Sequence, residues 1–273
     1  EKVFKSAIKP VLDKPVMKVL TRIPGINSLI FKKIREKLLS ALGGNLQMII
    51  MGGAPLNPEV EKWFKRIGLP YTVGYGMTEA APLLAYEPCT SYVPGSCGRS
   101  VDCAIVRIDS EDPQHVVGEI QAKGDNVCIG YYKNPEATAA AFTEDGFLKT
   151  GDLGIIDAHG NIFIRGRSKS MILSANGQNI YPEEVEAVVN NQDYVVESVV
   201  VDRAGKLVAL VYLDAEAMKK AGLDEETVAD LHETIRINAN KALPSYSQLQ
   251  KVEVVDKPFE KTPKMSIKRF MYK

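Results

Sequence analysis

Paired cysteines and long apolar runs are both missing from this sequence of 273 residues. No apolar run approaches the ~18 residues that a membrane-spanning helix needs, and no signal peptide is visible. The four cysteines show no Cys-x-x-Cys spacing, which disfavours a zinc site and a disulfide framework. We therefore interpret Cys89, Cys97, Cys103 and Cys128 as buried reduced thiols and expect a cytoplasmic protein.

A net charge is missing as well, because 34 lysine and arginine residues balance 34 aspartate and glutamate residues. Nothing global therefore indicates nucleic acid as a partner. The pattern Gly-x-x-x-x-Gly-Lys-Ser/Thr does not occur, which excludes a Walker-type phosphate loop. His115, His159 and His232 lie far apart in polar settings, so we interpret them as surface residues rather than metal ligands.

Charge is nevertheless uneven at the start, since residues 1–40 hold ten basic side chains and three acidic ones. Apolar residues between them recur at helical spacing, for example Phe31, Ile34 and Leu38. One interpretation is a pair of amphipathic helices that pack on the core with their lysines outward. The other is a surface that rests on anionic lipid, which would give peripheral contact with the inner face of the membrane.

The next segment predicts part of a parallel-sheet α/β domain. An apolar strand at residues 47–51 runs into Gly52-Gly53, and Asn57 then caps a helix that has Pro58 in its first position. A second strand at residues 71–73 also ends in a glycine turn. Ligands bind beyond the carboxyl ends of parallel strands, so both glycine turns should face one crevice.

Residues 95–166 predict a small antiparallel β-subdomain, with a hairpin turn at residues 158–161. Its expected strands are residues 104–108, 118–122, 155–157 and 161–165. Helix and strand alternate again beyond residue 167, with helices at 182–190 and 225–243 and strands at 194–202 and 207–213. We therefore expect an α/β and α+β fold, in which residues 1–167 form part of a large domain and residues 168–273 form a small α+β domain.

Three glycine-rich blocks carry groups that suit a nucleotide. Gly74 and Gly76 permit close backbone approach, Tyr75 offers an aromatic face, Thr78 a hydroxyl, and Glu79 an oxygen ligand for Mg²⁺. Asp152, in Thr150-Gly151-Asp152, could accept hydrogen bonds from vicinal hydroxyls on an exposed turn. Arg167 stands in the third block. Each block also has a structural alternative. Residues 74–79 could be a plain strand–helix turn with a structural tyrosine, residues 150–152 could be a simple turn, and Arg167 could be a surface residue in an ion pair.

Together with residues 51–56 and 258–263, these blocks resemble those of the AMP-forming acyl-CoA synthetases, and especially the long-chain fatty-acid–CoA ligases. The resemblance places Gly53, Ala54, Gly74 and Gly76 around the nucleotide. It implies that Tyr75 stacks on adenine, Thr78 contacts the α-phosphate and Glu79 holds magnesium. Asp152 and Arg167 would bind the ribose. Lys169 falls at the hinge of a mobile carboxy-terminal domain, and Gly177 falls in the loop that lines the coenzyme A tunnel.

The last block departs from the family pattern Lys-Thr-x-x-Gly-Lys-x-x-Arg. Aligning Lys261 and Arg269 puts Ser266 where the family has its catalytic lysine. Lys264 and Lys268 flank Ser266 and share its face if the segment is extended, so either could supply the cation. We prefer Lys264, which follows Pro263. The alternative is that both lysines are surface charges.

The family also has a Ser/Thr/Gly-rich phosphate loop upstream of these blocks, which this sequence lacks. The resemblance therefore implies the carboxy-terminal part of a longer ligase whose N-terminal half is missing. Its expected substrates are a fatty acid, ATP and coenzyme A, with Mg²⁺ as cofactor. The alternatives are another adenylate-forming ligase, acting on aryl, medium-chain or amino acids, and a non-catalytic fragment that binds nucleotide or a partner.

Overall fold

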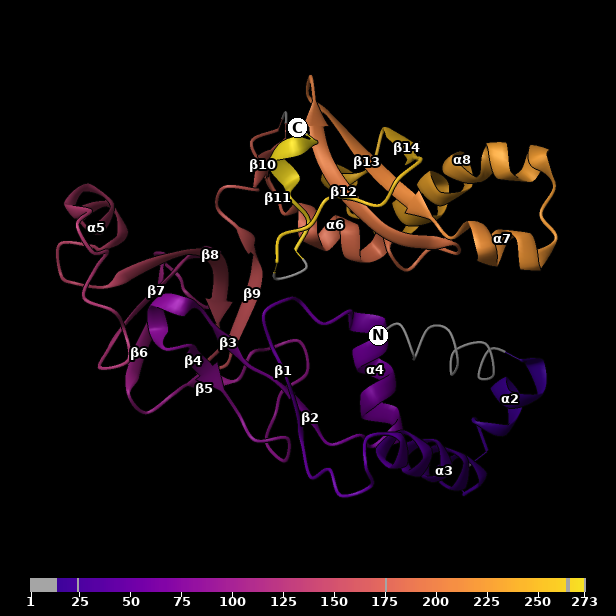
Figure 1. Cartoon of the computed structure of the whole chain (residues 1–273), viewed down its shortest axis with the longest axis horizontal. Helices are drawn as coiled ribbons and strands as arrows, with labels where there is room; N and C mark the ends of the chain where they lie inside the picture. The colour runs from indigo at the N-terminus through magenta and orange to yellow at the C-terminus, as the bar shows by residue number, and fades with distance from the viewer. Residues whose placement is uncertain (1–13, 24, 175, 264–265, 273) are drawn as a thin grey trace. The chain divides into compact units, whose positions relative to one another are not determined.

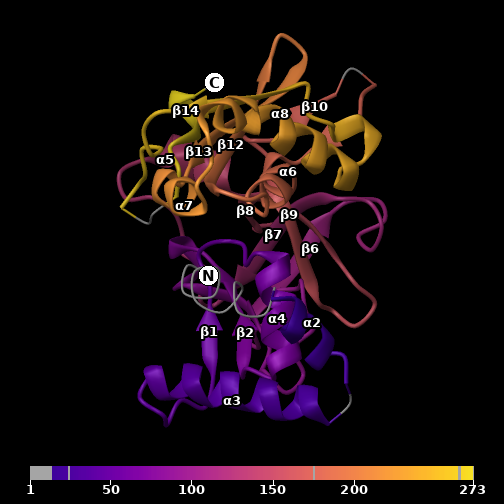
Figure 2. The same ribbon diagram turned by 90° about the vertical axis from the view of Figure 1, so that its right-hand side faces the viewer.

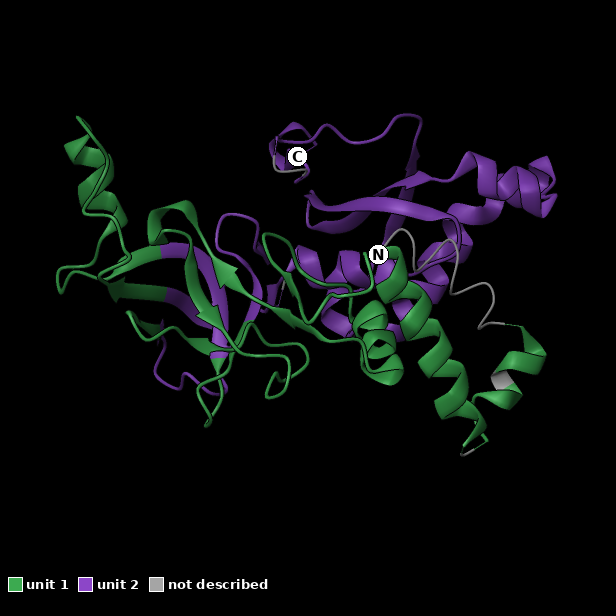
Figure 3. Ribbon diagram, turned by 60° about the horizontal axis from the view of Figure 1, so that its bottom comes forward, with its two compact units in different colours: residues 1–107, 121–149, 156–163 green, residues 108–120, 150–155, 164–273 purple. Residues whose placement is uncertain are grey.

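The computed structural model describes residues 14–23, 25–174, 176–263 and 266–272. They form two compact units (Figure 3). The first unit holds the described residues up to 107, with 121–149 and 156–163, and the second holds 108–120, 150–155 and the described residues from 164 onward. A four-stranded sheet contributes residues to both units; its order is β6 (Ala104–Asp109), β7 (Gly118–Gly124), β8 (Leu148–Ile156) and β9 (Ile162–Arg167). The domain boundary expected at residue 168 stays a prediction.

The first unit contains the expected parallel pair of strands. Its helices are α2 (Pro15–Leu20), α3 (Ile26–Ala41), α4 (Pro58–Ile67) and α5 (Pro135–Ala141), with a 3-10 turn η2 (Thr78–Ala80). Its strands are β1 (Ile49–Met51), β2 (Tyr71–Val73), β3 (Tyr75–Gly76), β4 (Leu83–Tyr86) and β5 (Arg99–Ser100). β1 and β2 run side by side and parallel, with Ile49 opposite Tyr71 (Figure 2). β3, β4 and β5 pair antiparallel.

Helix α4 begins where the sequence predicts. The side-chain oxygen of Asn57 accepts hydrogen bonds from the N–H groups of Glu59 and Val60, and Gly68 ends the helix in the left-handed conformation. α4 packs against α3, whose Phe31 shares a small core with Ile67. The helical packing expected for the basic segment is therefore confirmed for α3. Residues 1–13 lie outside the described residues.

The second unit is built on the sheet β12 (Val195–Arg203), β13 (Lys206–Leu213) and β14 (Lys251–Val255) (Figure 1). β12 pairs antiparallel with β13, and β13 pairs parallel with β14. The remaining elements are β10 (Ile172–Leu173), β11 (Asn179–Ile180), α6 (Pro182–Val189), α7 (Ala215–Ala221), α8 (Glu225–Ala242), η3 (Ser245–Ser247) and η4 (Arg269–Met271).

Both faces of this sheet are covered, which explains why β13 is almost continuously apolar and why β12 contains three consecutive valines. Val200 and Val211 face a core shared with α6 and α8. Val199 and Val201 point the other way, into a core closed by Phe259. Because side chains alternate between the two faces of a strand, one run of valines in β12 contributes to both cores.

The expected burial of the cysteines is only partly right. Cys97 is buried, Cys89 and Cys128 are partly buried, and Cys103 is exposed; all four are free thiols. Cys103 lies in the turn before β6, where Ala104 N–H donates to the Val101 carbonyl at 3.0 Å and the Cys103 side chain is exposed.

Candidate functional site

The two glycine turns after β1 and β2 lie next to each other. The N–H of Gly74 donates to the carbonyl of Met51 at 2.8 Å, and a Cβ placed on Gly52 would lie 3.2 Å from the carbonyl oxygen of Gly74. Gly53 adopts φ +81°, and both Gly53 and Ala54 are exposed. The structure thus brings residues 52–54 and 74–76 to one end of the parallel pair, as the strand pattern predicts.

Gly76 is required by close backbone approach. A Cβ on Gly76 would lie 1.9 Å from the carbonyl oxygen of Pro82, to which Met77 N–H donates at 2.8 Å. Tyr75 precedes it in β3 and is only 6% exposed. This burial supports the alternative of a structural tyrosine, and stacking on adenine stays a prediction.

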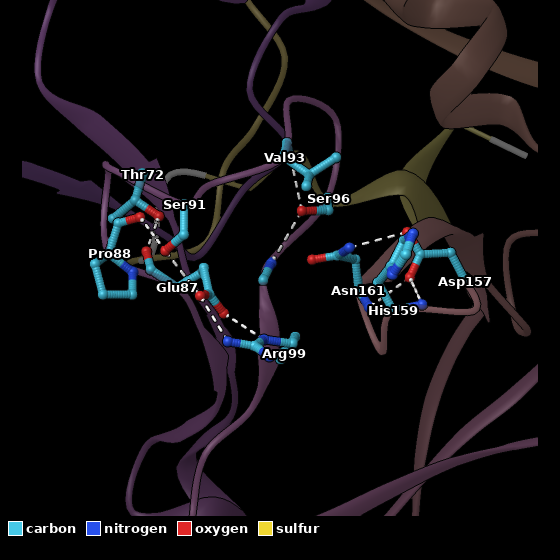
Figure 4. A network of polar contacts seen from close by, with 11 residues as sticks. Thr72, Glu87, Pro88, Ser91, Val93, Ser96, Arg99, Asp157, His159 and Asn161 are labelled. Carbon is cyan, nitrogen blue, oxygen red and sulfur yellow. Dashed lines mark hydrogen bonds and ion pairs between the residues drawn. The ribbon is translucent and has the colours of Figure 1, made fainter.

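A polar network fixes the middle of β2, the strand that leads into the second glycine turn (Figure 4). Thr72, the middle residue of β2, donates its hydroxyl to the carbonyl of Glu87 at 2.6 Å. The Glu87 carboxylate accepts two hydrogen bonds from Arg99, at 2.8 and 2.9 Å, and one from Ser91. The Arg99 guanidinium lowers the pKa of Glu87, so the carboxylate stays charged and the network keeps its geometry.

Thr78 and Glu79 occupy the turn η2, with Thr78 exposed and Glu79 partly buried. The hydroxyl of Tyr131 donates to Glu79 Oε1 at 2.9 Å, and the N–H of Cys128 donates to the Glu79 carbonyl at 2.7 Å. The hydrogen bond to the carboxylate raises the pKa of Tyr131. Tyr131 was not among the residues predicted from the sequence, although a Gly-Tyr-Tyr run before Asn134-Pro135 is an aromatic pair at a turn and could have indicated it.

The surroundings of Glu79 fit magnesium. Mg²⁺ in proteins usually takes one or two carboxylates and completes its shell with waters and substrate phosphates. Tyr131 donates to Glu79 Oε1, so the second carboxylate oxygen can serve a cation. The described part of the chain holds no cluster of three or more His, Cys, Asp or Glu side chains that could bind a metal alone, so a nucleotide would have to supply further ligands.

Asp152 and Arg167 are brought together in the second unit. Arg167 Nε lies 3.0 Å from Asp152 Oδ1. The expected exposed turn is wrong, because Asp152 lies inside β8 and its side chain is 8% exposed. Gly151 adopts φ +72° within that strand, and its N–H and C=O bind Glu119 and Ser168. These contacts continue the strand through a tripeptide that resembles a turn.

The expected hinge and coenzyme A loop lie in connecting segments of the second unit. Lys169 is exposed in the turn between β9 and β10. Gly177 adopts φ +75° at the tip of the β10–β11 hairpin, where a Cβ would meet no atom within 4 Å. The glycine is therefore needed for the backbone angle, and its role toward coenzyme A stays a prediction.

The region around Ser266 forms a short antiparallel hairpin. Thr262 N–H donates to the Ser266 carbonyl at 2.8 Å, and Lys268 N–H donates to the Glu260 carbonyl at 2.8 Å. Lys268 Nζ lies 3.2 Å from Glu260 Oε2, so its ammonium is ion-paired. Lys264 lies outside the described residues.

The candidate residues are thus distributed over both units. Gly53, Ala54 and residues 74–79 belong to the first, whereas Asp152, Arg167, Gly177 and Lys268 belong to the second. That all of them serve one nucleotide site stays a prediction.

Comparison with known families gives matches along most of the chain. The family of AMP-binding enzymes matches residues 14–132, and the AMP-binding enzyme C-terminal domain matches residues 169–272.

Several curated proteins are similar to this chain. The long-chain-fatty-acid–CoA ligase FadD15 of Mycobacterium bovis is 32% identical over 257 residues, covering 86% of this chain and 42% of that protein. Long-chain-fatty-acid–CoA ligase 4 of Saccharomyces cerevisiae is 34% identical, covering 72% of this chain and 27% of its own length. A 2-succinylbenzoate–CoA ligase of Listeria innocua is 34% identical, covering 73% of this chain and 42% of that protein. The chain therefore spans less than half the length of these relatives.

Solved structures show the same fold. ATP-bound MatB from Rhodopseudomonas palustris has a TM-score of 0.70 at 29% identity, over 88% of this chain and 48% of that chain. The O-succinylbenzoate coenzyme A synthetase MenE from Bacillus subtilis, in complex with ATP and magnesium ion, has a TM-score of 0.68 at 25% identity, over 86% of this chain and 49% of that chain.

Proposed function

This chain belongs to the AMP-binding enzymes, and on that premise we propose that the protein containing it is a long-chain fatty-acid–CoA ligase. Such an enzyme adenylates a fatty acid with ATP and then joins the acyl group to coenzyme A. The names of the mycobacterial and yeast relatives support this substrate class.

The observation that carries the proposal is the pairing of Asp152 with Arg167. Each residue stands in a separate sequence block, and the resemblance assigns both to the ribose of the nucleotide. Their side chains lie 3.0 Å apart, and Arg167 is mostly exposed while Asp152 is nearly covered. A buried carboxylate oriented by an arginine is suited to accept hydrogen bonds from two vicinal hydroxyls.

The proposed reaction has two displacements. In the first, a carboxylate oxygen of the fatty acid attacks the α-phosphorus of ATP, and the bond from that phosphorus to pyrophosphate breaks. In the second, the coenzyme A sulfur attacks the acyl carbonyl carbon, and the carbon–oxygen bond to AMP breaks. Both transition states concentrate negative charge, so oriented donors and cations stabilise them.

The chain supplies groups for these steps. Thr78 would donate its hydroxyl to the α-phosphate, and Glu79 would hold magnesium, which neutralises phosphate charge when bound. Lys264 or Lys268 would bring a cation to the meeting of carboxylate and phosphate. Gly177 would let the pantetheine arm pass close to the backbone.

The first test replaces Asp152 by Asn in the complete ligase and measures palmitate-dependent exchange of pyrophosphate into ATP. Because a hydrogen bond to a charged group is worth about 1.5–3 kcal/mol, kcat/KM for ATP should fall by roughly 10- to 150-fold. The matched control is Asp145→Asn, which breaks an exposed ion pair with Arg107 and should leave exchange unchanged. Equal exchange by Asp152→Asn and the parent would contradict the ribose role.

The acyl substrate is tested in the same assay with a panel of acids. Palmitate should support exchange and palmitoyl-CoA formation better than 2-succinylbenzoate, the substrate named for the Listeria relative. Preference for the aromatic acid would keep the adenylation chemistry and overturn the fatty-acid assignment.

We also propose that the protein works in the cytoplasm and rests on the inner face of the membrane through its basic helices. Val16 and Val19 of α2 and Leu29 of α3 are exposed, and so are Lys32 and Lys33 of α3. None of the helices in the described ranges is long and apolar enough to cross a bilayer, so such contact would be peripheral.

Vesicle sedimentation tests this contact. The protein should bind vesicles rich in phosphatidylserine, dissociate from them at high salt, and not bind neutral vesicles. Lys32→Glu with Lys33→Glu should weaken binding, whereas the same change at Lys219 and Lys220 of α7 should not. Equal weakening by both pairs would indicate only a general charge effect.

A further inference from the structure

We propose that Tyr131 is a positioning residue for Glu79, which orients the carboxylate so that one oxygen faces the cation. This inference rests on the proposed function, because it concerns the magnesium ligand of that site. It concerns a residue outside the blocks that carry the family resemblance.

The turn that carries Glu79 is held by few hydrogen bonds within itself. η2 spans Thr78–Ala80, with hydrogen bonds of 3.0 Å from Ala80 N–H to Met77 and 3.4 Å from Ala81 N–H to Thr78. A glutamate side chain on such a turn has three rotatable bonds, so its carboxylate needs outside contacts to be held in one place.

Those contacts come from the segment 126–131. Asn126 Nδ2 donates to the carbonyls of Ala80 and Leu83, at 3.0 and 2.7 Å. Cys128 N–H donates to the carbonyl of Glu79 at 2.7 Å. The backbone is thus fixed at Glu79 and at the residues that follow it by residues about fifty positions later in the chain.

Tyr131 adds the contact to the side chain, from its hydroxyl to Glu79 Oε1 at 2.9 Å. Tyr131 is itself fixed, because its N–H donates to Thr138 Oγ1 of α5 at 2.9 Å. A Cβ on the preceding Gly130 would lie 2.5 Å from the Thr138 side chain, which is too close for a real side chain. Glycine at position 130 therefore allows the backbone to approach Thr138. Helix α5 therefore fixes the position of Tyr131, and Tyr131 in turn orients the Glu79 carboxylate.

The chemistry explains why a phenol suits this position. A tyrosine hydroxyl donates to one carboxylate oxygen and leaves the charge in place, so the second oxygen remains an anionic ligand. A lysine or arginine would neutralise the carboxylate and compete with the cation. Outer partners that orient metal ligands in this way usually contribute 10- to 100-fold to metal affinity.

The test uses Mn²⁺ with ATP as the probe and follows binding to the complete ligase by enhancement of the water-proton relaxation rate. Tyr131→Phe should weaken Mn²⁺ binding by about 10- to 100-fold. Tyr132→Phe is the matched control, since Tyr132 is 89% exposed and makes no hydrogen bond through its hydroxyl to the described residues; it should change affinity by less than about twofold.

Two further measurements separate positioning from a merely structural role. The Mg²⁺ concentration for half-maximal exchange should rise in Tyr131→Phe, while kcat at saturating Mg²⁺ stays near the parental value. The double variant Glu79→Gln with Tyr131→Phe should bind Mn²⁺ as weakly as Glu79→Gln alone, because Tyr131 acts only through Glu79.

Several outcomes would overturn the inference: parental Mn²⁺ affinity in Tyr131→Phe, additive losses in the double variant, or loss of the folded protein on removal of this hydroxyl. None of them touches the proposed function, which fails instead if no acid supports pyrophosphate exchange.

Discussion

Ser266 stands where the family has its catalytic lysine, and the surroundings of the nearby Lys268 show whether this residue is free to replace it. Its ammonium lies against Glu260, and the backbones of the two residues are hydrogen-bonded. A lysine held in this pair must leave Glu260 before it can reach a substrate. This arrangement is consistent with our preference for Lys264 from the sequence.

We predict that Lys264→Ala in the complete ligase slows adenylation by roughly 100- to 1,000-fold and spares thioester formation from supplied acyl-adenylate. Only the first step brings two anions together, and loss of one stabilising group at such a transition state costs about 3–4 kcal/mol. Lys268→Ala should have a smaller effect, and Lys257→Ala, which removes an exposed lysine, should have none.

Glu260→Gln is the complementary change, because it frees Lys268 from its ion pair. If Lys268 rather than Lys264 supplies the cation, Glu260→Gln should change the rate of adenylation, because Lys268 no longer has to leave its ion pair. Parental rates in both lysine variants and in the double variant would contradict a catalytic role for either residue.

Predictability at the residue scale depended on how local the signal was. The Asn57 cap and the need for glycine at Gly76 follow from neighbours within a few positions. The burial of Asp152 could not be predicted from Thr-Gly-Asp, because it depends on Glu119 and Arg167 across the sheet. The Tyr131–Glu79 contact joins residues 52 positions apart, which no local pattern specifies.

Among the secondary-structure elements, α6 is joined to the carboxy-terminal tail by a buried ion pair. Arg269 donates to both oxygens of Glu186, and its guanidinium also lies 3.6 Å from Glu183. Glu186 accepts the N–H of Val200 in β12 as well. Burial raises the pKa of Glu186 to about 7, and the hydrogen bonds from Arg269 oppose that rise.

We predict that Arg269→Met destabilises the chain by about 3–5 kcal/mol, because the buried Glu186 carboxylate then lacks its counter-charge. The matched control is Arg236→Met on α8, which breaks a partly exposed pair with Glu233 and should cost about 1 kcal/mol or less. Urea unfolding followed by circular dichroism measures both.

A compensating change checks the cause. Glu186→Gln together with Arg269→Met removes both charges and should recover part of the lost stability. No recovery would mean that the packing of the arginine side chain, rather than its charge, carries the effect.

Elements with strong periodicity were the most predictable. The strands at 104–108, 118–122 and 207–213 and the helix at 225–243 lie within about two residues of β6, β7, β13 and α8. β8 is the exception, because its seven residues before the expected start at 155 include the Gly-Asp pair that was interpreted as a turn. Burial alternates along Leu148–Ile156 in the structure, but polar Thr150 and Asp152 occupy buried positions, so the sequence shows no alternation of apolar residues that would predict the strand.

At the scale of the whole molecule, the order of the blocks identified the family, but the sequence could not indicate how the chain returns between its two units. Strands β6 to β9 each contribute residues to both. That interleaving arises from pairings between distant segments, whereas the motifs are local. The class of fold was therefore predictable, whereas the grouping of Asp152 and Arg167 with the second unit was not.

The last prediction concerns the 273-residue chain by itself. We expect no palmitoyl-CoA when it is incubated with ATP, Mg²⁺, palmitate and coenzyme A, while the complete ligase turns over under the same conditions. The curated relatives are more than twice as long as the matched region, and the sequence holds no Ser/Thr/Gly-rich loop for the outer phosphates of ATP. Adenylation depends on holding the α-phosphorus in line with the attacking carboxylate, and that alignment is lost when the triphosphate is held at one end only. Isothermal titration gives an independent check, because a chain that contacts only adenosine and the α-phosphate should bind AMP about as tightly as ATP. Turnover at the rate of the complete enzyme, or a clear preference for ATP over AMP, would show that this chain already contains the triphosphate site.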